Sequence, residues 1–287
     1  MFPCMFATDL HGHVDRWEKL FRAIAESPPR AVFLGGDLLP SGLLSTMAAD
    51  PAHRDFVFDF LAPHLEELRR SLGPRFPKIC TILGNDDGRF EEPSFLDVAA
   101  QGLLVYAHER RVELDPYVLY GYSYVPPTPF LLKDWERYDL SRFVDPGSVS
   151  PEEGWRSVPV DPNEARYATI AEDLLRLAGE ADLARAVFLF HAPPYATHLD
   201  RAALDGKMVD HAPLDVHVGS IAMRTFIEER QPLVTLHGHI HESARLTGEW
   251  RDRIGRTLLL GAAHDGPELA LVRIDLDAPD AAVRQLL

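Results

Sequence analysis

Five short apolar runs, each followed directly by Asp, Asn or His residues, constrain the fold of this chain more than any other feature. Each run is rich in aliphatic and aromatic side chains and is too short for a typical helix, which predicts a buried β-strand. Two later apolar runs predict further strands. The five strands cover residues 2–7, 31–34, 79–83, 186–190 and 233–236, and the later two cover residues 257–260 and 269–274.

Side chains with oxygen or nitrogen donors follow all five strands at the point where each strand ends. Because the carboxyl ends of parallel strands face a common crevice, we expect these side chains to lie close together. The set contains no thiolate, so it suits Zn, Mn, Fe or Ni and not a soft metal. Its members are Asp9, His11, Asp37, Asn85, His191, His239 and His241.

A glycine directly precedes three of these side chains, at Gly36, Gly84 and Gly238. Glycine permits tight turns and close approach of the backbone, so these positions are typical of loops that present a ligand. In the last motif, His239 and His241 are two residues apart. Alternation along an extended segment places both imidazoles on the same side.

Helical patterns separate the predicted strands. Asp15 and Glu18 form a capping box that begins the first helix. In the second helix, Pro63 is expected to kink or split the element and Gly73 to close it. Strands that alternate with helices early and pair late predict a layered α/β domain. The second helix covers residues 53–72, and two further amphipathic helices cover residues 164–177 and 221–230.

The segment from residue 116 to residue 162 differs from the rest of the chain. It contains eight of the 23 prolines and nine aromatic residues, and it lacks regular periodicity. It is too aromatic for a disordered linker. Two interpretations remain: an irregular insertion packed on the core, or a lid that shapes a substrate pocket.

Composition excludes several classes of protein. With 29 Lys and Arg against 44 Asp and Glu, the net charge of −15 argues against binding to nucleic acid or to an anionic membrane. Cys4 and Cys80 lie in apolar runs and are expected to be buried thiols, too few for a disulfide scaffold. Apolar runs are far shorter than the ~20 residues that span a bilayer, and we see no signal sequence. We therefore expect a cytoplasmic location.

Taken together, the motifs Asp9-x-His11, Gly36-Asp37, Gly84-Asn85, His191 and Gly238-His239-x-His241 resemble the calcineurin-like metallophosphoesterase superfamily. All five blocks of the superfamily pattern occur in order. The stretch that begins at His191 also resembles a predicted phosphoesterase branch of bacteria and archaea. The resemblance implies a four-layer α/β/β/α sandwich, with two mixed sheets flanked by helices, as a single domain over residues 1–287.

The resemblance also implies two divalent metal ions, with Asp37 bridging them. Among Mn, Fe, Zn and Ni, we favour manganese. In the implied reaction, a hydroxide held between the ions attacks the phosphorus of a phosphodiester or phosphomonoester, so no side-chain nucleophile is required. Carried over residue by residue, Asp9, His11, Asp37 and His241 would bind one ion, and Asp37, Asn85, His191 and His239 would bind the other.

This sequence departs from the family pattern at Asp86, where the superfamily usually has a histidine. An ionised carboxylate cannot donate a proton to a leaving group. Either another histidine assists the leaving group, or the substrate has a good leaving group. The predicted catalytic residues at the centre itself are Asp37, Asn85 and Asp86. His198 is the candidate for this assistance, with His13 and His264 as alternatives.

The other histidines have weaker assignments. His237 either orients a ligand imidazole or simply ends its strand. Asp200 either contacts the cleft or is a cap or loop carboxylate, and we favour the second. The histidines expected to be solvated or structural are His53, His64, His108, His211 and His217.

Two functions follow from the sequence. The first is a metal-dependent phosphoesterase acting on a small phosphate ester, with diesters slightly favoured because a good leaving group needs less protonation. The second is a protein-interaction scaffold that keeps the fold but has weak or no hydrolase activity, which the departure at Asp86 would permit. The oligomeric state is not predicted.

Overall fold

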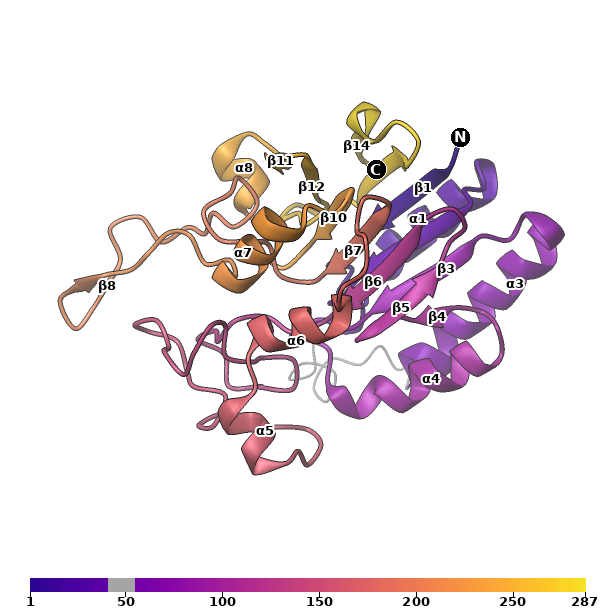
Figure 1. Cartoon of the computed structure of the whole chain (residues 1–287). Helices are drawn as coiled ribbons and strands as arrows, with labels where there is room; N and C mark the ends of the chain where they lie inside the picture. The colour runs from indigo at the N-terminus through magenta and orange to yellow at the C-terminus, as the bar shows by residue number, and fades with distance from the viewer. Residues whose placement is uncertain (41–54) are drawn as a thin grey trace.

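Two six-stranded mixed β-sheets lie face to face at the centre of the fold (Figure 1). The computed structural model describes residues 1–40 and 55–287. The first sheet has the order β14-β13-β1-β2-β3-β4, with β1 at Pro3–Ala7, β2 at Ala31–Gly35, β3 at Lys78–Ile82, β4 at Val105–Tyr106, β13 at Ala270–Asp275 and β14 at Val283–Leu286. The second has the order β11-β12-β10-β7-β6-β5, with β5 at Arg110–Glu113, β6 at Val118–Tyr122, β7 at Ala186–Phe190, β10 at Val234–His237, β11 at Arg251–Ile254 and β12 at Thr257–Gly261.

Within each sheet, the strands that precede the donor side chains run parallel to one another. In the first sheet, β1, β2 and β3 are parallel, with Ala7 opposite Leu34 and Gly35 opposite Ile82. In the second, β7 and β10 are parallel, with Leu189 opposite Leu236. The carboxyl ends of neighbouring strands are therefore level within each sheet, so the loops that follow them leave from a common edge.

A continuous apolar core joins the two sheets. Because side chains alternate along a strand, one set from each strand points toward the partner sheet and the other toward the helices. Phe6 and Phe33 of the first sheet belong to one buried cluster with Leu189 and Leu236 of the second. Cys4 and Cys80 lie in the same cluster as free, buried thiols, which confirms the expectation for both cysteines.

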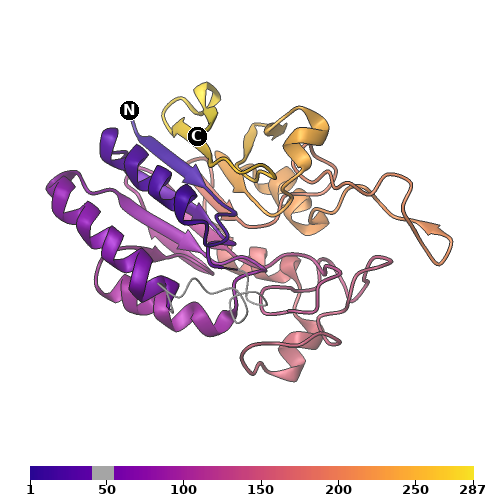
Figure 2. The same cartoon turned by 180° about the vertical axis from the view of Figure 1, so that it is seen from behind.

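Helices cover the outer face of each sheet (Figures 1 and 2). The chain is thus a four-layer α/β/β/α arrangement, and the predicted fold class is confirmed. Over the first sheet lie α1 at Val14–Glu26, α3 at Ala62–Leu72 and α4 at Glu92–Ala100; over the second lie α6 at Ile170–Ala178 and α7 at Ile221–Arg230. Shorter elements are η1 at Phe56–Leu61, η2 at Gly73–Arg75, η3 at Arg89–Glu91, α5 at Pro162–Tyr167, α8 at Ser243–Thr247, η4 at Pro279–Ala281, and the strand pair of β8 at Met208–Val209 with β9 at Ala212–Pro213.

All seven predicted strands are present, with bounds within one residue of those expected. Apart from β6, which lies inside the second sheet, the strands that sequence reasoning missed are two residues long or lie at sheet edges. Three of them, β5, β11 and β14, alternate charged or polar residues with few apolar ones, because an edge strand buries little surface and is protected from aggregation by its charges.

Two helix predictions require correction. The residue that caps α1 is His13, without a side-chain cap bond, so the capping box at Asp15 was wrong. The helix predicted over 164–177 is broken, because Thr169 is extended and caps α6 through its hydroxyl, which accepts from Glu172 N at 3.2 Å.

The other two helix predictions agree with the structure. The helix α7 has the predicted bounds. In the long second helix, a π-helix, η1, gives way to α3 one residue before Pro63, and Gly73 closes α3 as expected. The predicted start at His53 lies outside the described residues.

The Pro- and aromatic-rich insertion is partly regular. Strand β6 lies within the span 116–162, so the prediction of irregular structure was wrong for residues 118–122. Part of the remainder packs on the core, where Trp135 and Tyr138 are buried. The Asp134 carboxylate accepts from Arg89 N at 2.7 Å and from Ser157 N at 2.8 Å, which ties the insertion to the chain just after β3.

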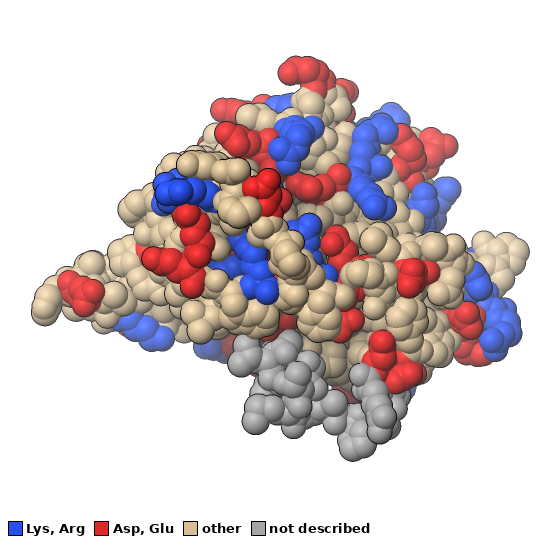
Figure 3. All heavy atoms as spheres, turned by 90° about the horizontal axis from the view of Figure 1, so that it is seen from below, with Lys and Arg blue, Asp and Glu red and all other residues tan. Residues whose placement is uncertain are grey.

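The face of the molecule seen from below carries charges of both signs. In the view from below, Lys and Arg side chains are interspersed with Asp and Glu, without a broad area of either sign (Figure 3). Among the described helices, none combines the length and the apolar character that crossing a bilayer requires.

Candidate metal centre

Two groups of donor atoms form where the loops from both sheets meet. Within each group the ligand atoms lie within 4.8 Å of one another. Asp37 belongs to both groups, so its carboxylate lies between them. The first group is Asp9, His11, Asp37 and His241, and the second is Asp37, His191 and His239.

The first group is held by short contacts among its imidazoles and carboxylates. His241 Nε2 lies 3.1 Å from Asp9 Oδ1 and 3.2 Å from His11 Nε2. His11 Nε2 lies 4.0 Å from Asp37 Oδ2. Donors at these separations point at a common centre, which is the arrangement that a cation needs.

The second group includes Asn85. His191 Nε2 lies 3.3 Å from Asp37 Oδ2 and 3.0 Å from Asn85 Oδ1. The other ring nitrogen, Nδ1, lies 2.8 Å from the carbonyl of Gly35 and donates to it, which leaves Nε2 facing the group. The structure therefore brings all seven predicted donors together, since the His239 ring lies 5.2 Å from that of His191.

The backbone at the centre is strained in four places. Asp9, His11, Asp37 and His239 have positive φ values of 56°, 46°, 50° and 74°. Side chains other than glycine rarely adopt this conformation, and it persists at sites that the surrounding structure determines strongly. Hydrogen bonds from Asp9 N to the Gly36 carbonyl (3.0 Å) and from His11 N to the Asp37 carbonyl (2.8 Å) hold the two loops together.

Two of the predicted close-approach glycines explain how the loops fit. A Cβ at Gly84 would lie 2.3 Å from Asp37 Oδ1 and 2.7 Å from His191 Cε1. A Cβ at Gly238 would lie 2.7 Å from Asp9 Oδ2. Both contacts are far below van der Waals separation, so only glycine leaves room for the carboxylates.

Asp86 contacts the first group from outside it. Its Oδ2 lies 3.3 Å from His11 Nδ1, and its backbone N–H donates to Asp37 Oδ1 at 2.8 Å. A hydrogen bond from Nδ1 to Asp86 leaves Nε2 of His11 as the atom that faces the centre. The structure thus gives Asp86 a positioning contact with His11.

Asp87 is a site residue that sequence reasoning missed. Its side chain is only 1% exposed and accepts from Leu38 N at 3.0 Å, Leu39 N at 2.9 Å and Gly84 N at 2.9 Å. It therefore locks the loop carrying Asp37 to the loop carrying the third motif. Burial, together with the charge of Asp37, raises the pKa of Asp87 to about 7. The available signal was a second acidic residue directly after Asp86.

The electrostatics of the centre favour bound cations. Burial alone would raise the pKa of Asp37, but the charge of His191 outweighs it and holds that pKa well below its usual range. Burial would lower the pKa of both His191 and His11, but nearby carboxylates raise each to about 9. Protons on these imidazoles balance the buried carboxylates, and divalent cations held by the same donors would take over that role.

His239 behaves differently from its neighbours. Burial, helped by the charge of His191, lowers the pKa of His239 to about 3. Its imidazole is therefore neutral and keeps a lone pair for a metal ion. The donor set as a whole, with carboxylate, imidazole and amide groups and no thiolate, fits divalent metals of the Mn, Fe, Zn and Ni kind.

The structure does not bring His198 to this cluster. Its side chain is 53% exposed and lies 3.3 Å from Asp252 on edge strand β11. His13 is exposed at the start of α1, and His264 Nε2 lies 3.0 Å from Glu268 Oε2. None of these contacts involves a member of either donor group, so the geometry gives no support to the predicted role of His198.

The remaining histidines fill structural roles where they are buried. Both ring nitrogens of His237 are used, with Ala192 O at 2.9 Å and Thr235 Oγ1 at 2.7 Å, so it ends its strand and orients no predicted ligand. His217 Nδ1 lies 2.8 Å from Asp200, whose buried carboxylate also accepts backbone N–H groups of its own loop. Asp200 is therefore a loop carboxylate, as favoured.

His108 is buried among aromatic rings, and we predict that it makes the stability of the protein depend on pH. Burial, with help from the charges of Arg89 and Arg137, lowers the pKa of His108 well below its usual range. Below pH ~6.5, His108 binds a proton in the unfolded chain but stays neutral in the folded chain. The free energy of unfolding therefore falls as the pH falls. The free energy of unfolding should be about 1.4 kcal/mol lower at pH 5.5 than at pH 7.5.

The check is the free energy of unfolding in urea at the two pH values. His108→Gln should lose about 1.4 kcal/mol less than the wild type on going to pH 5.5. His198→Gln is the matched control, since its ring is 53% exposed. Equal pH dependence in the wild type and His108→Gln would contradict the prediction.

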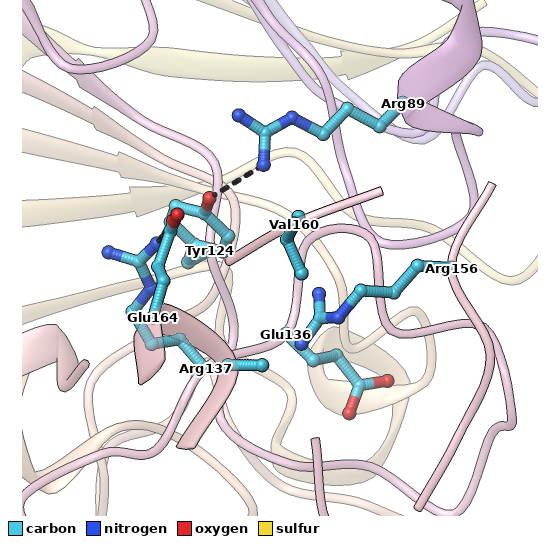
Figure 4. Close-up of a pocket in the computed structure, with 8 residues that line it drawn as sticks. Arg89, Tyr124, Glu136, Arg137, Arg156, Val160 and Glu164 are labelled. Atoms are coloured by element: carbon cyan, nitrogen blue, oxygen red, sulfur yellow. Dashed lines mark hydrogen bonds and ion pairs between the residues drawn. The ribbon is translucent and has the colours of Figure 1, made fainter. Parts of the chain in front are cut away.

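A hollow lined by Arg89, Arg137 and Arg156 lies beside the loop that follows β3 (Figure 4). Arg89 donates to the Tyr124 hydroxyl at 3.2 Å, and Arg137 is paired with Asp173. The hollow encloses only about 10 Å³, which is room for about one water molecule. The hollow is therefore too small for a phosphate ester. The contacts of these arginines join the insertion to the core and give them a structural role.

The fold and the paired donor groups define a metallophosphoesterase. The family of calcineurin-like phosphoesterases matches residues 2–243, and the chain belongs to this family. The family is dimetal-dependent, in agreement with the two donor groups.

Solved structures with the same fold have distant sequences. The protein TT1561 of Thermus thermophilus is 16% identical, with 99% of this chain and 98% of that chain covered and a TM-score of 0.58. A dimetal phosphatase from Danio rerio is 13% identical, with coverage of 95% and 91% and a TM-score of 0.54. At these identities the likeness shows the fold alone. Comparison with curated protein sequences gave no match.

Proposed function

We propose that this protein is a dinuclear metal-dependent phosphoesterase that hydrolyses small phosphodiesters, and phosphomonoesters less readily. The observation that carries the proposal is the position of Asp37 between two compact donor groups. A carboxylate can share its charge between two cations, which a neutral ligand cannot do. The geometry of one shared carboxylate between two sets of imidazoles supports a two-ion centre.

The proposed ligands are those that the structure brings together. Asn85 is neutral, so it adds a ligand without reducing the positive charge that attracts a phosphate group. When bound, two divalent ions, for which we propose manganese, supply a water of lowered pKa and stabilise charge on the phosphoryl oxygens. Asp9, His11, Asp37 and His241 would hold one ion, and Asp37, Asn85, His191 and His239 the other.

Asp86 supports the preference for diesters. Its contact with His11 Nδ1 makes it a positioning residue for that ligand. An ionised carboxylate there cannot protonate a leaving group, so an ester whose alcohol leaves readily is the better substrate. A protein-interaction scaffold without hydrolase activity would also tolerate Asp86 in place of the usual histidine. Such a scaffold is the competing function.

Hydrolysis of two chromogenic esters tests the proposal. Purified protein loaded with manganese should release p-nitrophenol from bis-p-nitrophenyl phosphate, and more slowly from p-nitrophenyl phosphate. Removal of the metal by a chelator should stop both reactions, and added manganese should restore them. Metal analysis on the same sample should give about two ions per chain, as expected for a two-metal site.

The outcomes separate the two functions. Bound metal without turnover of either ester would contradict the hydrolase and favour the scaffold. Faster hydrolysis of the monoester than of the diester would contradict the proposed preference but would leave the hydrolase intact.

A further inference from the structure

A second hollow, lined by none of the donor residues, is far larger than the hollow in Figure 4. It encloses about 360 Å³, which lies within the range of small-molecule sites, whereas the hollow in Figure 4 encloses about 10 Å³. Its walls come from two segments far apart in the chain: the insertion, from Pro126 to Asp145, and the segment that follows β7, from Tyr195 to Ile221. Both segments lie on the same side of the molecule (Figures 1 and 2).

The hollow is within reach of the metal centre along the chain. Tyr195, in its wall, is four residues beyond His191. A segment of four residues spans at most ~14 Å when fully extended. Tyr195 N donates to Ser220 O at 2.9 Å and Ser220 N donates to Pro193 O at 2.9 Å, which fixes this wall against the loop of His191.

One part of the wall is apolar and uncovered. The side chains of Leu140, Phe143 and Ile221 are 50%, 70% and 43% exposed. Together with the ring of Tyr195, they present aliphatic and aromatic surface to whatever enters. Large exposed apolar groups gathered in a concave site are typical of ligand binding.

The charged part of the wall is entirely acidic. The lining contains Asp139, Asp145 and Asp215 and neither Lys nor Arg. Asp139 is used structurally, since its carboxylate accepts from Ser220 Oγ and from Ile221 N at 2.7 Å at the start of α7. Asp215 accepts from the Tyr195 hydroxyl at 2.7 Å, and Asp145 has no ion pair with a described residue.

The remaining titratable group in the wall is also accounted for. The imidazole of His217 lies 2.8 Å from Asp200, so any positive charge it carries is balanced there. Burial and the charge of the neighbouring Asp215 both raise the pKa of Asp145. Carboxylates beside aromatic rings are the combination that binds alkylammonium groups.

From these observations we infer that this hollow binds a positively charged alkylammonium group on the alcohol part of the substrate. The inference rests on the proposed function, since it names the alcohol of the ester that the metal centre would hydrolyse. Asp145 and Asp215 attract the charge, Phe143 and Tyr195 cover its methyl or methylene groups, and the phosphate reaches toward His191. The same lining repels alcohols that carry a negative charge.

Paired probes that differ only in charge test the inference. Choline and 3,3-dimethyl-1-butanol have the same shape, but only choline is cationic, and their binding to the manganese-loaded protein is followed by NMR saturation transfer and titration. We expect choline to bind about tenfold more tightly, since exposed ion pairs and cation–π contacts are individually weak. Asp145→Asn together with Asp215→Asn should reduce that preference to about twofold or less.

The same pair, as p-nitrophenyl esters of phosphocholine and of 3,3-dimethylbutyl phosphate, gives the kinetic readout. Both release p-nitrophenol, so the ratio of their kcat/KM values reports only the remote group. Glu180→Gln is the matched control, because this exposed carboxylate lies before β7, at the end opposite His191. Phe143→Ala should weaken the binding of both probes.

Each outcome is decisive. Equal binding of choline and its neutral analogue, or a preference that survives loss of both carboxylates, would overturn the inference even if both esters are hydrolysed. Selective binding of choline without turnover of either ester would support the binding site and would count against the proposed hydrolase instead.

Discussion

Asp37→Asn is expected to abolish hydrolysis while leaving the fold intact. The substitution keeps the size of the side chain but removes the negative charge that both donor groups share. Loss of about 4 kcal/mol of metal-assisted stabilisation corresponds to a fall of about 10³-fold in kcat/KM. Metal content should fall together with turnover, and both are measured on the same preparation with bis-p-nitrophenyl phosphate as substrate.

The control for this variant is Glu180→Gln, the same change of charge at an exposed position away from the centre. It should keep both its metal and its activity. Full activity in Asp37→Asn with full metal content would show that the shared carboxylate is not needed, and the two-ion proposal would fail.

Asp87→Ala is expected to have the largest effect on stability among changes near the centre. The substitution leaves the N–H groups of Leu38, Leu39 and Gly84 buried without their acceptor. At about 1 kcal/mol for each lost partner, the free energy of unfolding should fall by about 3 kcal/mol. Activity should fall as well, because the loops that carry Asp37 and Asn85 lose their common anchor.

Urea unfolding measures the stability change, with Asp97→Ala as the control. Asp97 is exposed on α4, so its removal should change stability by less than about 0.5 kcal/mol. Asp87→Asn retains one acceptor oxygen and should fall between the wild type and Asp87→Ala. A loss of less than about 1 kcal/mol in Asp87→Ala would contradict the role of Asp87 as an anchor.

The two predictions probe different layers of the same site. Asp37 is a donor in both groups, whereas Asp87 accepts hydrogen bonds from backbone N–H groups and acts through the loops that it joins. The two roles are distinguished if Asp37→Asn loses activity but keeps its stability, while Asp87→Ala loses both.

Sequence alone predicted the elements whose formation depends on local pattern. The seven apolar runs are strands of the two sheets. Each carries enough apolar side chains to favour burial in the core, irrespective of which strands pair with it. The donors that follow them converge because chain direction places the ends of parallel strands together. Gly84 was predicted for the same local reason, and the structure shows the Asp37 carboxylate occupying the space of its missing side chain.

Features that depend on distant partners were not predictable. Edge strands such as β5 and β11 carry little apolar surface, so only the strand beside them shows that they are strands. The helix predicted across Thr169 is broken because the Tyr138 carbonyl accepts from Ile170 N at 2.8 Å, a contact across the fold that local propensity cannot register.

By itself, the sequence determined the order of the strands along the chain and the chemical identity of the seven donors. Both follow from short apolar runs and from the residues that come directly after them. Only the tertiary structure decided that Asp87 joins two loops, that His198 lies away from the centre, and that the insertion and the segment after β7 enclose an acidic hollow. The physical reason is that these properties depend on contacts between residues far apart in the chain, and such contacts exist only once the two sheets have packed together.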